Sequence, residues 1–260
     1  MCAILGTYLL LIIMILAGDV FYVFFNNHQE SSFFSVLNKP EIKNSIVLSL
    51  LSCSLTSFLA IFFAVPSGYI LSRYKSRFVS ILDTILDIPL VLPPLVVGLS
   101  LLILFQLWPL NESFFGGESL KSFIVYQVPA VVLAQFTVVT AYAIKMTKVT
   151  FMQIPDRAEK VAYTLGCSKF QAFFHVVLPE ALSGIMTAWT LAWARSLGEF
   201  GPLLIFAGIT RNKTEVLSTS VFMELSLGNI QGAVVISLIM ILTSVVILLF
   251  ARLWANKALL

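Results

Sequence analysis

Charged residues are scarce in this sequence of 260 residues. Asp, Glu, Lys and Arg together make up 11% of it, whereas soluble globular domains carry about a quarter. Hydrophobic residues account for 59%, and the mean hydropathy is +0.97. This composition excludes an ordinary soluble domain and predicts a protein that lies in lipid. No run or predicted face concentrates the 16 Lys and Arg, so nucleic acid is not an expected partner.

Cysteine is scarce as well, and the residue patterns of catalysis are missing. Cys2, Cys53 and Cys167 lack the spacing of a metal site, and we expect neither a bound metal nor a disulfide. The sequence has no G-x-x-x-x-G-K-S/T loop, so we do not expect this chain to hydrolyse a nucleotide. Its Ser, His and Cys residues form no pattern typical of a nucleophile and its base. We therefore expect no catalytic residue and no cofactor.

Long apolar stretches are what the sequence does contain. Six of them, each about 20 residues long, can cross a hydrocarbon core ~30 Å thick. The first lacks a basic region before it and a small-residue cleavage site, so we expect a retained helix rather than a signal peptide. With no internal repeat and no linker, residues 1–260 are expected to form a single, all-α membrane domain of about six transmembrane helices. The stretches are 8–25, 46–71, 88–107, 127–145, 181–207 and 232–254.

Lys and Arg are distributed unevenly between the two ends of these stretches. Cytoplasmic loops of membrane proteins carry an excess of both residues. Ten of them follow the second, fourth and sixth stretches, five lie on the other side, and Arg195 lies inside a stretch. The distribution predicts that the side with ten, and with it both termini, is cytoplasmic.

The longest cytoplasmic connection, 146–179, has the pattern of two short helices joined by a glycine. Ala158, Val161, Ala162 and Leu165 recur at helical spacing before Gly166, and Ser168 can cap a second helix. One interpretation is an amphipathic segment that lies on the membrane surface. The other is a rigid helix–Gly–helix projection that fits a groove on a soluble partner. Periodicity alone does not choose between them.

Two charged residues lie within the fifth stretch. Arg195 and Glu199 are four residues apart, so they share one face of a helix. Each unpaired charge at that depth would cost at least about 2.5 kcal/mol. They either form a structural ion pair or line a translocation pathway. Gly198 and Gly201 permit another helix to approach, and Pro202 frees the carbonyl of Gly198, so we expect a bend that suits a gate.

The third stretch contains two consecutive prolines. Pro93 and Pro94 follow Pro89 by one helical turn and precede Gly98. Such prolines occur in membrane helices without a function when neighbours bind the freed carbonyls. We favour the alternative, in which they mark a broken helix beside the pore.

The connection 146–179 resembles the cytoplasmic loop of ABC importer permeases, which reads approximately E-A-A, then Gly, then a hydrophobic residue with Leu-Pro. The matching residues are Glu159, Ala162, Thr164, Leu165, Gly166, Leu178 and Pro179, whereas Lys160 and Val161 depart from the pattern. In that family the loop forms the coupling helix, which lies in a cleft of the ATP-binding subunit. The resemblance implies the type I importer fold and a docking role for these residues.

A narrower resemblance is carried by the two motifs inside the membrane. Arg195-Ser-Leu-Gly-Glu-Phe-Gly201 and the segment Pro89 to Gly98 are similar to motifs of molybdate, tungstate and sulfate permeases, and the doubled proline is nearer the molybdate and tungstate members. Pro202 departs from the small residue usual there.

The resemblance implies a set of partners and a location. These are a second copy of the permease in a homodimer, two ATPase subunits, an external oxyanion-binding protein and the lipid of the cell membrane. The cargo implied is molybdate or tungstate, with sulfate or thiosulfate as the alternative. Two less favoured alternatives are an ion-coupled secondary transporter that uses an intramembrane acid such as Glu199, and a membrane-embedded enzyme.

Overall fold

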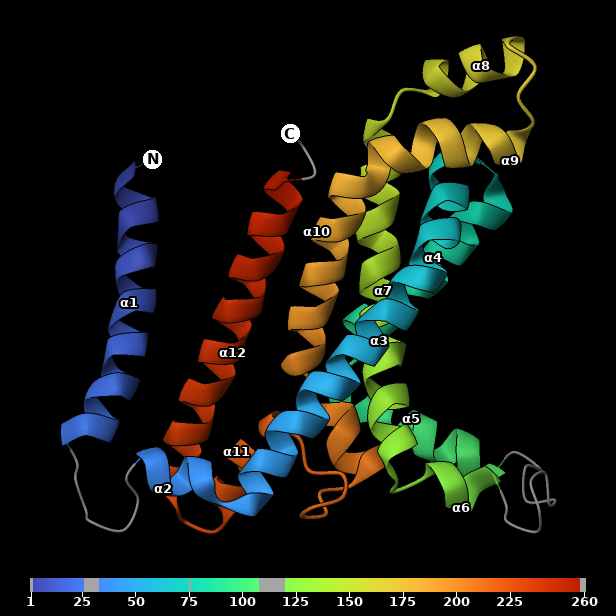
Figure 1. Ribbon diagram of the computed structural model, residues 1–260. Coiled ribbons are helices and arrows are strands. Elements are labelled where there is room, and N and C mark those ends of the chain that lie inside the picture. The colour runs from blue at the N-terminus through green and yellow to red at the C-terminus, as the bar shows by residue number, and fades with distance from the viewer. Residues whose placement is uncertain (1, 26–32, 75, 108–119, 258–260) are drawn as a thin grey trace.

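The computed structural model describes residues 2–25, 33–74, 76–107 and 120–257. Helices account for nearly all of these residues, and no strand occurs among them (Figure 1). In chain order the helices are α1 (Cys2–Phe25), α2 (Phe33–Asn38), α3 (Pro40–Arg73), α4 (Arg77–Val91), α5 (Pro94–Leu107), α6 (Leu120–Ile124), α7 (Val128–Gln153), α8 (Asp156–Thr164), α9 (Lys169–Ala172), η1 (Phe173–Val177), α10 (Leu178–Leu197), η2 (Leu203–Ala207), α11 (Leu217–Ser226) and α12 (Ile230–Lys257).

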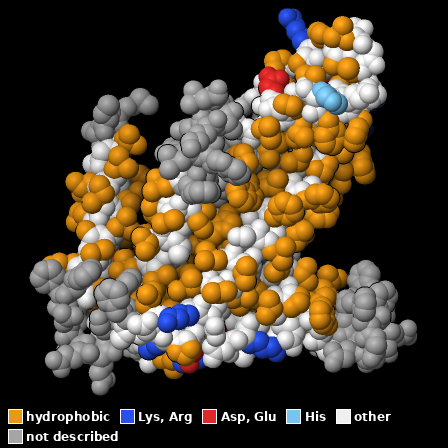
Figure 2. Space-filling model, in the orientation of Figure 1, with side chains coloured by type: hydrophobic (Ala, Val, Ile, Leu, Met, Phe, Trp, Pro, Cys, Tyr) orange, Lys and Arg blue, Asp and Glu red, His pale blue; other side chains and the backbone are white. Residues whose placement is uncertain are grey.

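The number of membrane spans agrees with the prediction of about six. Five segments of the described chain are long and apolar enough to cross a membrane, and α4 with α5 makes a sixth if this bent pair is one span. The start of α1, the end of α12 and the short helix α8 lie at the same end of the molecule (Figure 1). Hydrophobic side chains cover most of the visible face between the two ends (Figure 2).

The third span differs from its predicted form. The chain breaks at Pro93, within the predicted stretch 88–107, and the axes of α4 and α5 differ by 108°. The part before the break is α4, which begins at Arg77, eleven residues before the predicted apolar stretch 88–107. Pro94 starts α5, where its missing N–H costs no hydrogen bond. The predicted break is therefore confirmed, and it is sharper than a kink.

The fifth span is also discontinuous. The prediction of one helix over 181–207 is wrong, because α10 ends at Leu197 and the chain leaves helical geometry before Gly201. Pro202 lies in the first turn of the next helical segment, where proline is well tolerated. The break thus lies before the proline, and Pro202 starts a new helix rather than bending an existing one.

The centre of the bundle is formed by α3, α7 and α10, which pack through small residues. Ala60, Ala64, Ala143 and Ala192 are fully buried in one cluster between these helices. The hydroxyl of Thr147 donates a hydrogen bond to the carbonyl of Ala64 at 2.9 Å. Small side chains and interhelical hydrogen bonds are the usual means by which helices associate in lipid. This centre holds the ends of α3 and α10 in fixed positions, and both ends carry residues of the sites described below.

Candidate functional site

The two broken spans meet at their breaks. A Cβ atom added to Gly201 would lie 2.6 Å from the Cβ of Pro94, and one added to Gly98 would lie 2.8 Å from the Cα of Pro202. No side chain fits at either glycine without displacing backbone. Gly201 thus contacts Pro94, and Gly98 contacts Pro202. We call this contact between the two broken spans the junction.

The charged pair lies beside this junction. Nη1 of Arg195, in the last turn of α10, is 2.8 Å from Oε2 of Glu199. The Glu199 side chain is 1% exposed and that of Arg195 is 40% exposed. Oε1 of Glu199 has no hydrogen-bond partner among the described residues. The two residues form the ion pair that was one of the two alternatives, with the guanidinium on the open side and the carboxylate enclosed.

Gly198 does not share the role of Gly201. A Cβ on Gly198 would approach only the carbonyl of Arg195, at 3.8 Å, so no neighbouring helix requires a glycine there. Gly198 instead follows the last residue of α10 as its C-cap. It serves the end of the helix rather than the contact between spans.

Sequence reasoning missed a buried polar residue that holds the end of α10. The Gln135 side chain, on α7, donates through Nε2 to the carbonyl of Ser196 at 3.3 Å. Its Oε1 accepts a hydrogen bond from the Thr56 hydroxyl at 3.1 Å. Gln135 is 1% exposed. Its position as a polar residue within an apolar stretch was the available signal, because a buried amide in lipid requires partners.

A second missed element is α11, which attaches the loop before the last span to the junction. The Ser218 hydroxyl donates to the backbone carbonyl of Glu199 at 2.8 Å. The backbone N–H of Leu217 donates to the Ser49 hydroxyl, also at 2.8 Å, which ties α11 to α3. Only tertiary structure brings these short polar side chains together, and their spacing in the sequence carries no signal. The α11 helix is therefore placed to connect the loop that precedes it with the break at Glu199.

The predicted helix–Gly–helix connection is present as α8, Gly166 and α9. Gly166 has φ +92°, a conformation that residues with a Cβ rarely adopt, and Cys167 N–H donates to the carbonyl of Ala162 at 3.0 Å. Ser168 caps α9 and forms a capping box with Gln171. Asp156 does not cap α8, because its carboxylate pairs with Arg73 at 2.7 Å.

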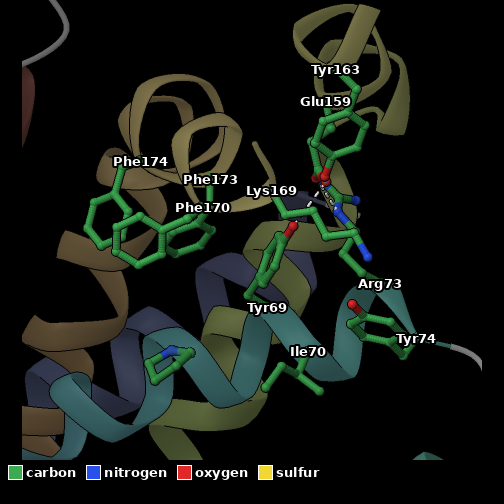
Figure 3. Close-up of a pocket in the computed structure, with 11 residues that line it drawn as sticks. Tyr69, Ile70, Arg73, Tyr74, Glu159, Tyr163, Lys169, Phe170, Phe173 and Phe174 are labelled. Carbon is green, nitrogen blue, oxygen red and sulfur yellow. Dashed lines mark hydrogen bonds and ion pairs between the residues drawn. The ribbon is translucent and has the colours of Figure 1, made fainter. Parts of the chain in front are cut away.

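Glu159 turns toward the end of α3 rather than away from the protein. Arg73 Nε lies 2.6 Å from its Oε1, and the hydroxyls of Tyr69 and Tyr163 donate to its Oε2 at 3.0 and 3.4 Å (Figure 3). Glu159 is 6% exposed. Partial burial and the Glu159 carboxylate raise the pKa of Tyr163, so its hydroxyl stays protonated and able to donate. We call Arg73, Glu159, Tyr69 and Tyr163 the clamp, because they attach α8 to α3.

The opposite side of α8 presents apolar residues that no described part of the chain covers. Val161 is 57% exposed and Leu165 is 78% exposed, whereas Ala162 between them is buried against the protein. Leu178 and Pro179 lie at the start of α10, with Leu178 partly buried. The residues of the predicted docking loop are therefore divided between an internal contact and an open apolar face.

Comparisons with known proteins agree with this architecture. Residues 58–258 match the family described as "Binding-protein-dependent transport system inner membrane component". The molybdenum transport system permease protein ModB of Mycobacterium tuberculosis is 30% identical over 217 residues, which cover 84% of this chain and 81% of the relative. The sulfate transport system permease protein CysT of Escherichia coli is 29% identical over 249 residues, 94% of this chain and 88% of the relative.

Solved structures show the same fold at low sequence identity. A chain of a bacterial alginate ABC transporter superposes with a TM-score of 0.77 at 16% identity, covering 98% of this chain and 93% of that one. A chain of the MetNI methionine ABC transporter gives 0.65 at 15% identity, covering 85% and 99%. Together with its membrane spans, the family match identifies a multi-pass membrane protein with the type I importer fold. The chain therefore belongs to the inner membrane components of binding-protein-dependent transport systems, the permease subunits of ABC importers.

Proposed function

We propose that this permease forms the membrane pathway of an ATP-driven importer for a tetrahedral oxyanion, molybdate or tungstate. The observation that carries the proposal is the junction of the two broken spans, with Arg195 and Glu199 beside it. A contact between two helix breaks can open when either helix end moves. Arg195 would attract an anion, while Glu199 offsets part of its charge and keeps the anion from binding too tightly to leave.

The docking of an ATPase is proposed for the loop 146–179. The exposed Val161 and Leu165 offer an apolar contact of the kind that dominates protein interfaces. Glu159 would support docking indirectly, because its ion pair with Arg73 holds α8 against α3. Gly166 permits the turn to α9, and η1 continues through Leu178 and Pro179 into α10. A displacement of α8 by the ATPase would thus reach the end of α10, where the junction lies.

The orientation and the assembly are part of the proposal. Both termini and α8 would be cytoplasmic, on the side that has ten Lys and Arg. Almost all side chains of the apolar segment Ile4–Val23 of α1 are exposed in this chain, Val23 being the buried one, and α1 stands apart from most of the bundle (Figure 1). Such a helix favours packing on a second copy, so we propose a homodimer with two ATPases and an external oxyanion-binding protein.

Competition between anions tests the choice of cargo. The relatives named above transport molybdenum and sulfate by their names, at similar identity, so sulfate or thiosulfate is the second candidate. Cells that depend on this permease for uptake of labelled molybdate would be challenged with excess tungstate or sulfate. We expect tungstate to block the uptake and sulfate to leave it intact. Inhibition by sulfate at equal concentration would instead support the second candidate.

A further inference from the structure

Two neighbouring hollows lie on the side of α3. The first has a volume of about 660 Å³ and is bounded by the clamp and by α9 and η1 (Figure 3). The second, of about 740 Å³, lies between α3, η1 and α10. Pro66, Phe173 and Phe174 line both hollows. Because they share these residues, we treat the two hollows together as the α3 groove.

The length of the α3 groove matches one leaflet of a bilayer. Its lining residues on α3 extend from Phe58 to Tyr74. At ~1.5 Å per residue, the part from Phe58 to Arg73 is about 22 Å long. Half of a bilayer with its headgroup region is ~20–22 Å thick. A groove of this length accommodates a lipid that stands upright in one leaflet.

The α3 groove is polar at one end and apolar at the other. Phe58, Phe62 and Trp189 line the apolar end, and none of its lining residues is charged. Lys169, Arg73 and Glu159 line the other end. This gradient follows the order of acyl chain, interface and headgroup in a membrane.

Positive charge predominates at the polar end. The Glu159 carboxylate is already bound by Arg73 and by two tyrosine hydroxyls. Nη2 of Arg73 is buried and has no hydrogen-bond partner among the described residues. Lys169 forms no ion pair with a described residue, and it lies with Arg73 at the border of the same space (Figure 3). A buried guanidinium N–H and a free ammonium group together fit a phosphate.

We infer that the α3 groove binds one anionic phospholipid from the leaflet at the α8 end. Its phosphate lies between Lys169 and Arg73, and an acyl chain follows Phe174 and Pro66 toward Trp189. The lipid lies against α9, η1 and α3, next to the clamp. The position of the docking helix α8 therefore depends on whether this lipid is present. A helix of a second copy is the rival occupant.

Lipid retention by the purified protein tests this inference without a transport measurement. The full chain, with the partners that copurify, is extracted in mild detergent and analysed by native mass spectrometry after addition of phosphatidylglycerol or phosphatidylcholine. Lys169→Gln removes one charge from the groove and leaves an exposed helix position intact. Lys213→Gln removes the same charge from an exposed loop at the other end of the molecule and serves as the matched control.

The expected result is one retained phosphatidylglycerol per chain. Lys169→Gln should lower this retention about fivefold, since a Lys near an anionic lipid contributes ~1 kcal/mol. The control variant should retain the lipid as the wild type does. The inference would be overturned if the wild type retained phosphatidylglycerol and phosphatidylcholine equally, or if Lys169→Gln retained as much phosphatidylglycerol as the wild type. The inference would also be overturned if the dimer retained no lipid and residues of the α3 groove crosslinked to the second copy. A failure here leaves the proposed oxyanion transport untouched, because retention is measured without cargo or ATP.

Discussion

Gly201 lies directly against Pro94, so close that an added Cβ atom would be 2.6 Å from the proline Cβ. The contact joins two spans whose helices are both interrupted at this level. Interrupted helices are the usual way in which membrane transporters place a movable element inside the bilayer. A small movement of either helix end at the junction would therefore change the contact between the two spans.

A methyl group at the junction should impair transport. Gly201→Ala forces the backbone at Pro94 to move, and overpacking of this kind destabilises by about 1–3 kcal/mol. We expect lower thermal stability in detergent and a strong loss of uptake. Gly198→Ala is the control, because its Cβ has room, and it should retain most of the activity. Full uptake by Gly201→Ala would show that the contact does not matter for transport.

The Arg195–Glu199 pair should be needed for passage of the anion rather than for assembly. We expect Arg195→Gln to assemble and to lose most uptake, because it removes the positive group from the open side of the pair. Glu199→Gln should also assemble, because the amide can still accept a hydrogen bond from Arg195. Uptake rates and the amount of assembled complex are measured together. Full-rate transport by both variants would contradict the pathway assignment.

An apolar-to-charged change on α8 should abolish docking. Leu165→Glu places a carboxylate at a position that is 78% exposed and keeps the backbone of Gly166 unstrained. Loss of a central apolar contact costs about 2 kcal/mol or more, so affinity for the ATPase should fall more than tenfold. Copurification with the ATPase measures the effect.

Arg157→Glu is the control, because it also introduces a carboxylate at an exposed position of α8. Arg157→Glu should therefore retain more binding than Leu165→Glu. Unchanged copurification of Leu165→Glu would remove α8 from the interface.

The clamp should behave as a coupled unit. Arg73→Gln leaves the largely buried Glu159 carboxylate without its ion-pair partner, which costs about 3 kcal/mol in comparable pairs, whereas Glu159→Gln leaves Arg73 paired with the exposed Asp156 alone. The double variant should be less destabilised than the sum of the two single variants. Thermal unfolding of the wild type, the two single variants and the double variant in detergent measures this coupling as a double-mutant cycle. Additive effects would show that Arg73 and Glu159 stabilise α8 independently.

The buried Glu215 should make the stability of the loop before α11 sensitive to pH. Burial raises the pKa of this carboxyl, whose side chain is almost enclosed, so the fold favours the protonated form. Its favourable contribution is complete below about pH 4, the pKa of an unfolded Glu, and is lost as pH rises through the folded pKa. Glu215→Gln should therefore raise the unfolding temperature at neutral pH and not at pH values near 4. A variant that is less stable at neutral pH would contradict this sign.

Much of this architecture follows from local patterns in the sequence. Apolar length predicts the spans, Gly166 with Ser168 predicts the turn between α8 and α9, and Pro93–Pro94 predicts a broken helix. These features depend on the backbone preferences of one segment. The 108° angle at the break and the early end of α10 depend on what packs around them, and a continuous apolar run conceals both.

The contacts between distant segments lay beyond sequence reasoning for the same reason. Polar residues flank Glu159 in the sequence as they would a surface acid, yet its side chain is buried in an ion pair with Arg73. Ser218 reaches the carbonyl of Glu199 only because α3 holds α11 in place. The sequence shows which residues are polar, while the fold decides which partner each one meets.

Uptake by purified components tests the central claim most directly. The permease would be reconstituted in vesicles with its ATPase, and labelled molybdate would be supplied with the external binding protein. We predict uptake that requires ATP, persists with an uncoupler, and is lost when Gly201→Ala replaces the wild-type chain. Uptake that proceeds without ATP, or that collapses with the uncoupler alone, would contradict an ATP-driven pathway through this junction.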